Sequence, residues 1–274
     1  MRGRVRTGST EIFVSINERP LILTVETATR AGSVALNAGA RLIAARVGSD
    51  QTSHSTNLLQ DIGSLLKEAG LELHRVDLFA AASGPGSFTG LRIGLATVKS
   101  FAATLERPCL GVPTLTAIAH GAGASRQTMA LLPAGRGEMF AQLLQVDENN
   151  EVTPLTEAAH LAPRRVLEMA AKIRPLKWAG EGAHLQRETI REFAERHKIA
   201  FLDEACEGTA TLRKEEEAWT LAPPTQILAA SVGQLAWRRF ESGETAQAQD
   251  LRAIYVRASD AELKERCQEQ RLPS

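Results

Sequence analysis

The chain has 274 residues, of which 43% are hydrophobic, and 32 Lys and Arg residues balance 32 Asp and Glu residues. This apolar content supports a large core and excludes global disorder. The formal net charge of zero argues against a protein that binds nucleic acid by itself, because phosphate neutralisation supplies most of that affinity. Cys109, Cys206 and Cys267 are too widely separated to indicate a disulfide framework or a thiolate metal site.

The N-terminal residues 1–20 are expected to form a disordered tail. They include Arg2, Arg4 and Arg6 but no apolar segment typical of a secretory signal; an organelle transit peptide is the less favoured alternative. No apolar run approaches the roughly 20 residues that cross a bilayer, so no membrane partner is expected. The cysteine usage fits a reducing, cytoplasmic location.

The first half of the folded chain is predicted to follow the order βββαβαβα. Hydrophobic patterning predicts strands over 21–26, 33–36 and 41–47 and an amphipathic helix over about 56–69. A buried strand over 78–82 leads through the sequence SGPGSFTGLRIG at 83–94 into a helix that continues to Glu106. A strand over 109–112 and a short helix over 114–120 complete this half.

The second half repeats this order. Strands are predicted over 129–132 and 139–146 and near Val152, and Pro163 opens a helix through Ile173. The remaining elements are a strand over 176–179, a loop over 180–182, a helix over 185–197, a strand over 199–202, a charged loop, and a helix from Pro224 through Phe240.

Two successive βββαβαβα halves predict an α/β protein with a duplicated ribonuclease H-like fold, the plan of actin-like ATPases. We expect an N-terminal lobe over 21–125, a C-terminal lobe over 126–245 and a C-terminal tail over 246–274. In this plan a nucleotide would lie between the lobes, held by the turns at 27–32 and 134–137.

The glycine-rich stretch has two interpretations. Its spacing matches neither a P-loop nor a dinucleotide fingerprint. Gly86, Gly90 and Gly94 fall four residues apart, on one face of the predicted helix, which favours close packing against a second helix. The alternative is a phosphate held at the helix N-terminus, where backbone N–H groups are free.

Several motifs resemble the TsaB (YeaZ) family. They are LTVETAT at 23–29, GPGSFTGLRIG at 84–94, GV with TL at 111–115, RGEMF at 136–140, GEGA at 180–183, and IYVR with AELK at 254–264. The resemblance covers about residues 21–264, and the GPGSFTGLRIG element is its most specific part.

This resemblance implies a non-catalytic scaffold or activator subunit of the machinery that makes threonylcarbamoyladenosine beside the anticodon of tRNA. The expected partners are a TsaD-like catalytic paralogue and a TsaE-like ATPase, with a homodimer when the chain is alone and tRNA bound only through the complex. The chain is expected to have no cofactor of its own, although ATP or ADP with magnesium can be accommodated at a complex interface.

The catalytic paralogue carries an HxxxH metal motif that this chain lacks. Thr114 and Ile118 stand at the two positions, and neither can replace imidazole as a ligand. Pro133 and Ala134 stand where the family often has an aspartate, so we predict a pseudo-enzyme with no catalytic or metal-binding residues. His120 is a nearby histidine for which a metal role is not expected.

The alternative is an ATP-dependent transferase or kinase, which would need paired carboxylates on magnesium. Glu26 and Glu181 are the candidates, although Glu181 is expected on a loop facing water.

Two sets of site residues are predicted. By resemblance, the two helices that flank strand 78–82 form the partner interface, through Leu58, Leu59, Ile62, Leu66, Gly90, Leu91, Gly94, Leu95 and Val98. A nucleotide would be contacted by Glu26, Thr27, Gly84, Gly86, Ser87, Arg92 and Gly135.

Overall fold

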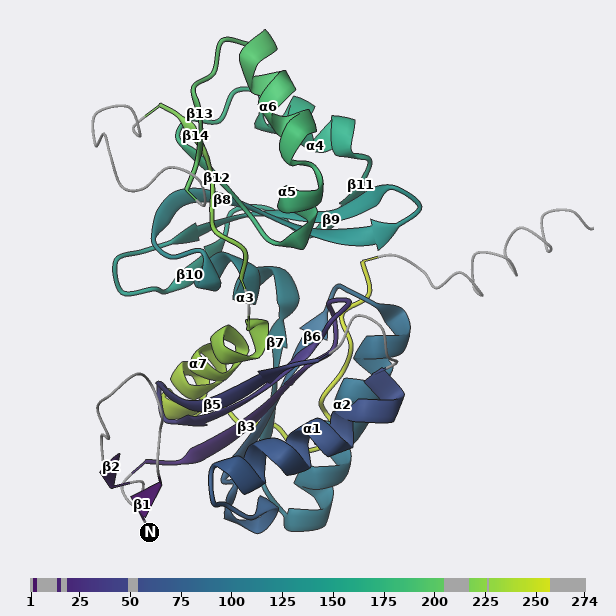
Figure 1. Cartoon of the computed structure of the whole chain (residues 1–274), viewed down its shortest axis with the longest axis vertical. Coiled ribbons are helices and arrows are strands. Elements are labelled where there is room, and N and C mark those ends of the chain that lie inside the picture. Colours follow the sequence, from purple (N-terminus) through teal and green to yellow (C-terminus); the bar gives the residue numbers. More distant parts are fainter. Residues whose placement is uncertain are drawn as a thin grey trace, which may run out of the picture.

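The computed structural model describes residues 2–3, 14–15, 19–48, 54–204, 217–225 and 227–256, which form two α/β lobes (Figure 1). None of the helices in these ranges combines the length and apolar character that crossing a bilayer requires. β1 (Arg2–Gly3) and β2 (Val14–Ser15) pair with each other, and the expected disorder of 1–20 falls mostly outside the described residues.

The first lobe is built on a five-stranded sheet in the order β5-β4-β3-β6-β7. β3 (Leu21–Glu26), β4 (Ser33–Ala38) and β5 (Arg41–Val47) are antiparallel. β6 (Leu78–Gly84) pairs in parallel with β3, and β7 (Cys109–Pro113) pairs in parallel with β6. The predicted strands of this lobe are confirmed.

Helices cover both faces of this sheet: α1 (His54–Glu68) and α2 (Phe88–Leu105) on one, α3 (Thr114–Gly121) and α7 (Leu228–Glu241) on the other. Successive side chains of a strand point to opposite faces, so β3 contributes to two cores. Leu23 and Val25 pack with α1 and α2, whereas Ile22 packs with α3 and α7.

The second lobe has a sheet in the order β10-β9-β8-β12-β14-β13, and β11 also pairs with β9. Its strands are β8 (Ser125–Gly135), β9 (Glu138–Val146), β10 (Val152–Pro154), β11 (Ala159–Leu161), β12 (Leu176–Ala179), β13 (Phe201–Asp203) and β14 (Trp219–Leu221). Its helices are α4 (Pro163–Ala170), α5 (Glu181–Leu185) and α6 (Arg187–Arg196).

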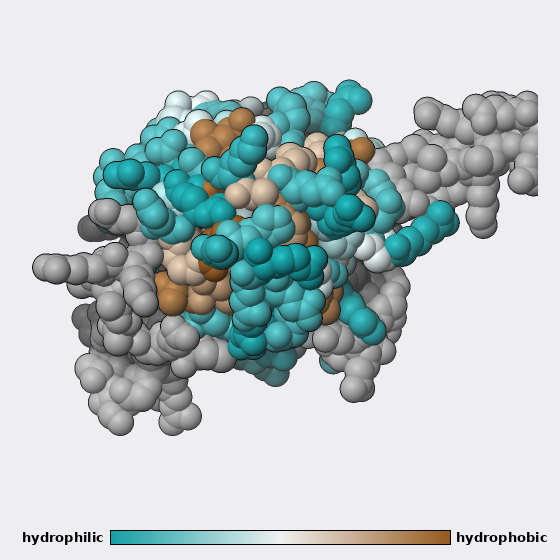
Figure 2. Space-filling model, turned by 90° about the horizontal axis from the view of Figure 1, so that it is seen from above, coloured by the Kyte–Doolittle hydropathy of each residue, from teal (hydrophilic) through white to brown (hydrophobic). Residues whose placement is uncertain are grey.

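The two faces of the second sheet have different neighbours. One face packs with α4, α5 and α6 around Trp178 and Trp219, whose rings meet edge to face at 5.0 Å. The other face packs on α3, which therefore lies between the two sheets. Seen from above this lobe, the surface is mostly hydrophilic, with smaller apolar areas between the polar side chains (Figure 2).

The duplicated fold is confirmed, with differences in the second half. β11 and β14 are additional strands of three residues each, too short to stand out from their polar surroundings. The predicted loop over 180–182 and helix over 185–197 are replaced by α5, which already begins at Glu181 after Gly180 at φ 92°, and by α6, with Gln186 between the two helices. α7 begins at Leu228 rather than at Pro224.

α7 follows the strands of the second lobe in the chain but packs on β3 and β4 of the first (Figure 1). The division of the chain into lobes between residues 125 and 126 stays a prediction. α7 belongs to the range 126–245 in the sequence, but it packs against the sheet of the first lobe.

Residues 246–256, which we call the strap, run from α7 back to the edge of the first sheet. The backbone N of Cys109 donates to Ala246 O at 3.0 Å, and the backbone N of Ile254 donates to Ser83 O at 2.7 Å. Leu251 between these two anchors is buried. The strap is thus fixed at both ends, and it brings Tyr255 and Val256 to the space between the lobes.

Candidate functional site

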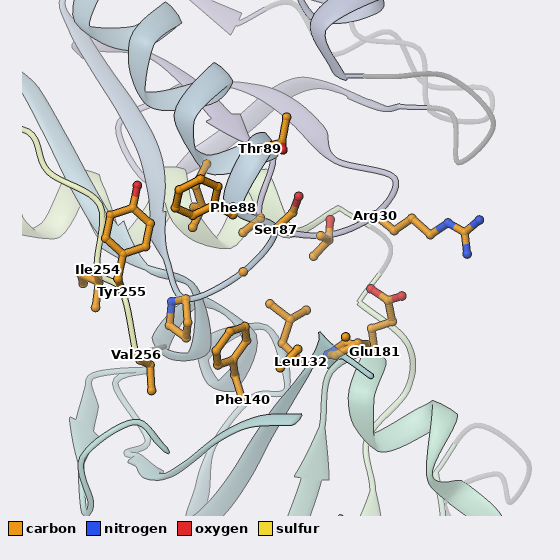
Figure 3. Close-up of a pocket in the computed structure, with 18 of the residues that line it drawn as sticks. Arg30, Ser87, Phe88, Thr89, Leu132, Phe140, Glu181, Ile254, Tyr255 and Val256 are labelled. Atoms are coloured by element: carbon orange, nitrogen blue, oxygen red, sulfur yellow. The ribbon is translucent and has the colours of Figure 1, made fainter. Parts of the chain in front are cut away.

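A cleft of about 750 Å³ lies between the lobes (Figure 3). Its first wall is the turn after β3 and the loop that begins α2, and its second wall is the end of β8 with Phe140 and α5. The strap supplies the third wall through Ile254, Tyr255 and Val256. In Figure 3, Arg30 and Glu181 lie at one end of the cleft, and Tyr255 and Val256 lie at the other. The volume suits a small molecule or a short peptide segment.

Glu26 ends β3 and organises the turn that follows it. The carboxylate is 1% exposed and accepts hydrogen bonds from Thr29 N at 2.7 Å, Thr29 Oγ1 at 2.9 Å and Ser33 Oγ at 3.2 Å. Thr29 Oγ1 and Ser33 Oγ in turn accept from Gly32 N and Ala229 N, so both hydroxyl hydrogens are available for Glu26. All the neighbours in this network therefore donate to the carboxylate.

Two opposing effects act on the pKa of Glu26. Burial raises the pKa, since a charged carboxylate loses its water, and the hydrogen bonds from Thr29, Ser33 and the Ala28 backbone lower it in part. Because every hydroxyl in the network is already committed as a donor to Glu26, the arrangement is complementary to the ionised form. Glu26 thus holds the turn through both of its carboxylate oxygens.

Three of the four glycines of the 84–94 stretch, Gly86, Gly90 and Gly94, face the turn after β3. A Cβ on Gly86 would stand 2.6 Å from Ala28 Cβ, and a Cβ on Gly90 or Gly94 would stand less than 3.0 Å from Thr27 atoms. Thr27 Oγ1 donates to Gly90 O at 2.7 Å. The close-packing interpretation of the spacing is therefore correct, but the partner is this turn and not a second helix.

The residues predicted to contact a nucleotide separate into three groups. Gly86, Ser87 and Gly135 line the cleft, and Glu26 lines a smaller adjoining pocket of about 390 Å³. The other three, Thr27, Gly84 and Arg92, point elsewhere.

Thr27 is buried against Gly90, and Gly84 is buried between Ile254 and Leu91. The Arg92 guanidinium lies 3.9 Å from the centroid of the Phe88 ring. Nucleotide binding by the remaining residues stays a prediction. Glu181, expected on a loop facing water, is instead the first residue of α5 and is half-buried in the cleft wall.

The structure also places the residues that the sequence comparison set against the HxxxH motif and the aspartate of the family. Thr114 is buried, and its Oγ1 accepts from Gly84 N at 3.2 Å; Ile118 lines the adjoining pocket. Pro133 borders the cleft without a carboxylate. Within the described residues, no three His, Cys, Asp or Glu side chains gather as metal ligands would.

His120, the histidine near Thr114 and Ile118, lies in an environment that disfavours a positive charge. Burial, together with the positive charge of Arg238, lowers the pKa of this imidazole to about 4.

Most of the predicted interface residues lie in the core of this chain. On α1, Leu58, Ile62 and Leu66 are buried; on α2, Leu91, Leu95 and Val98 are buried. The prediction that Gly90 and Gly94 face a partner is wrong, because Thr27 occupies that space. Leu59, 64% exposed, is the residue of this set that remains at the surface.

The outer face of α1 and α2 has a different set of small exposed residues. Gly63, four residues after Leu59, is exposed, and a Cβ there would meet nothing within 4 Å. On α2, Ala96, Ser100 and Ala103 are exposed at helical spacing. Sequence analysis missed these positions, although a glycine inside an amphipathic helix is a signal that could have found Gly63. We call Leu59, Gly63, Ala96, Ser100 and Ala103 the outer helix face.

Comparison with known proteins identifies relatives of the whole arrangement. The family model for TsaD, described as tRNA N6-adenosine threonylcarbamoyltransferase, matches residues 48–264. The chain is 38% identical over 133 residues to the tRNA threonylcarbamoyladenosine biosynthesis protein TsaB of Escherichia coli, which covers 47% of this chain and 56% of that protein. It is 27% identical over 173 residues to TsaB of Bacillus subtilis, a match that covers 62% of this chain and 75% of that protein.

A solved structure of YeaZ from Pseudomonas aeruginosa matches with a TM-score of 0.64 and 27% identity, over 86% of this chain and 99% of that one. By sequence the chain spans about half the length of the Escherichia coli relative, whereas the structural match covers the two lobes together.

Proposed function

Because this chain belongs to the TsaB (YeaZ) family, whose named relatives are tRNA threonylcarbamoyladenosine biosynthesis proteins, we propose that it is a non-catalytic subunit that pairs with a TsaD-like catalytic subunit. In this role it supports threonylcarbamoyl transfer to the adenosine beside the anticodon of tRNA. The observation that carries the proposal is the chemistry of the cleft. By resemblance to the catalytic paralogue, Thr114 and Ile118 stand at the positions of its two metal-binding histidines and Pro133 at that of an aspartate, and in this chain they are a buried hydroxyl, an apolar pocket residue and a proline of the cleft wall.

The same chemistry argues against a transferase or kinase. Such an enzyme would hold magnesium between carboxylates and phosphates. Both carboxylate oxygens of Glu26 accept hydrogen bonds from Thr29 and Ser33. A magnesium ion bound there would compete with the hydrogen bonds that hold the turn. This use of Glu26 supports the proposal that ATP or ADP with magnesium binds only at an interface with a partner.

The outer helix face is the surface that we propose for pairing. A glycine inside a helix costs about 0.5–1 kcal/mol relative to alanine, and none of the described residues comes close enough to require one at residue 63. Small residues allow another helix to approach closely and gain many dispersion contacts. Leu59 beside Gly63 supplies the apolar side chain for such a contact.

Pairing is tested with the TsaD-like subunit of the same organism. Gly63→Arg and Ala96→Arg should weaken association by at least tenfold in a calorimetric titration, while circular dichroism of the free chain stays unchanged and its thermal unfolding temperature does not fall. Met169→Arg, at a 49% exposed position on α4 of the other lobe, is the matched control and should bind normally. Full-strength binding by Gly63→Arg would place the interface elsewhere.

The remaining partners follow from this role. We propose that a TsaE-like ATPase joins the complex, that tRNA binds through the assembled complex, and that the chain forms a homodimer through the same face when alone. A neutral chain has little electrostatic attraction for RNA, which fits tRNA contacts made mainly by the partner. The setting proposed for these reactions is the cytoplasm.

A further inference from the structure

The cleft concentrates exposed apolar side chains. Leu185 is 63% exposed, Tyr255 49% and Ile254 41%, and all three line it. They account for three of the eight large hydrophobic residues exposed in the described part of the chain. Single exposed apolar residues are ordinary, but a group of them around a concave surface is typical of a docking site.

The cleft is also where the described chain stops. The strap is anchored by Ala246 and Ile254, and Tyr255 packs on Phe88 with ring centroids 5.4 Å apart. Val256, the last described residue, lines the cleft itself. The described chain therefore ends in the cleft wall, and the 18 residues of segment 257–274 follow Val256 in the sequence.

We infer that segment 257–274 docks in this cleft and covers its apolar wall. A covalently attached segment is present at an effective concentration in the millimolar range, so even weak contacts suffice to hold it. The seven residues 257–263 that follow Val256 can span up to about 25 Å, which exceeds the width of a cleft of this volume. Reach therefore does not limit docking.

The composition of the segment matches the surface that it would cover. Its apolar residues are Ala258, Ala261, Leu263, Cys267 and Leu272. They alternate with acidic and basic residues, and the cleft has Arg30 and Glu181, one charge of each sign, at the end opposite the strap (Figure 3). Leu185, Leu132 and Phe140 form the apolar wall that Leu263 and its neighbours would contact.

Docking of this segment makes the cleft a self-occupied site. Any small molecule or partner that enters between the lobes must displace segment 257–274 first, so the contact is autoinhibitory. It involves neither the outer helix face nor pairing with another subunit, so it can be tested independently of the proposed function.

The test measures how fast maleimide labels Leu185→Cys, in a background with Cys206→Ser and Cys267→Ser. The rate is compared between the full chain and a chain that ends at Val256. We expect labelling to be several-fold slower in the full chain, and a synthetic peptide of residues 257–274 that carries Cys267→Ser, added to the shortened chain, should restore the protection. Met169→Cys, on the outer surface of the same lobe, is the control and should label equally fast in both chains.

Three outcomes would overturn the inference. Equal labelling rates of the full and shortened chains would show that the segment does not cover Leu185. Protection that disappears on dilution would indicate a second copy of the chain as the occupant. Equal slowing at Met169→Cys would indicate a general effect of the segment on the protein, and thermal unfolding of both chains checks that they are equally folded.

Discussion

The side chain of Thr27 occupies the space that a Cβ on Gly94 would need. A Cβ added to Gly94 would come within 3.0 Å of Thr27 Oγ1, whose hydroxyl donates to Gly90 O. The start of α2 is thereby locked to the end of β3, and the glycine-rich stretch serves the internal structure of the first lobe.

Gly94→Ala should destabilise the chain. The added methyl group must displace Thr27, and overpacking of this kind costs about 1–3 kcal/mol, more than the gain of about 1 kcal/mol in helix propensity. Urea unfolding measures the difference. In the double variant Gly94→Ala, Thr27→Ala, part of the lost free energy of unfolding should be recovered, because the clashing hydroxyl is then gone. Strictly additive effects of the two substitutions would contradict the proposed contact.

Gly63→Ala should have the opposite effect on the free chain. A Cβ at residue 63 meets open space, so the substitution gains helix propensity of about 0.5–1 kcal/mol without a clash. The midpoint of urea unfolding should therefore rise. A fall in stability would mean that Gly63 is needed inside this chain and is not available to a partner.

Glu26→Gln should destabilise the turn after β3, although the glutamine side chain has nearly the same shape as glutamate. The amide N–H groups would face hydroxyls that already donate, and an unsatisfied buried group costs about 1–3 kcal/mol. Hydrogen exchange should also accelerate at the amide of Ala229, which donates to Ser33 Oγ. Glu157→Gln, at an exposed position, serves as the control and should leave both measurements unchanged.

The stability of the chain should depend on His120 at mildly acidic pH. Burial lowers the pKa of His120 to about 4, whereas the unfolded chain binds the proton near its usual pKa of 6.5. The unfolded state therefore takes up a proton first, so stability is lost as pH falls from 6.5 towards 4. Unfolding measured across this range should show a weaker pH dependence for His120→Gln than for the original chain. An unchanged slope would mean that the imidazole is accessible to protons in the folded state.

The sequence by itself determined the order of the elements, the duplicated plan and the absence of a metal-ligand pair at Thr114 and Ile118. These depend on local periodicity and on residue chemistry, which a single chain reveals without knowledge of its neighbours. The four-residue spacing of Gly86, Gly90 and Gly94 also indicated that something approaches α2 closely.

Only the tertiary structure decided what approaches. Spacing defines a helix face but not its neighbour, so the contact with Thr27 and Ala28 could not be separated from an interface with a partner. The packing of α7 on the first sheet, the hydrogen bond from Ala229 N to Ser33 Oγ, and the placement of Tyr255 in the cleft all join segments that are far apart in the sequence. Such contacts arise from the way the sheets and helices pack, and local patterns carry no information about them.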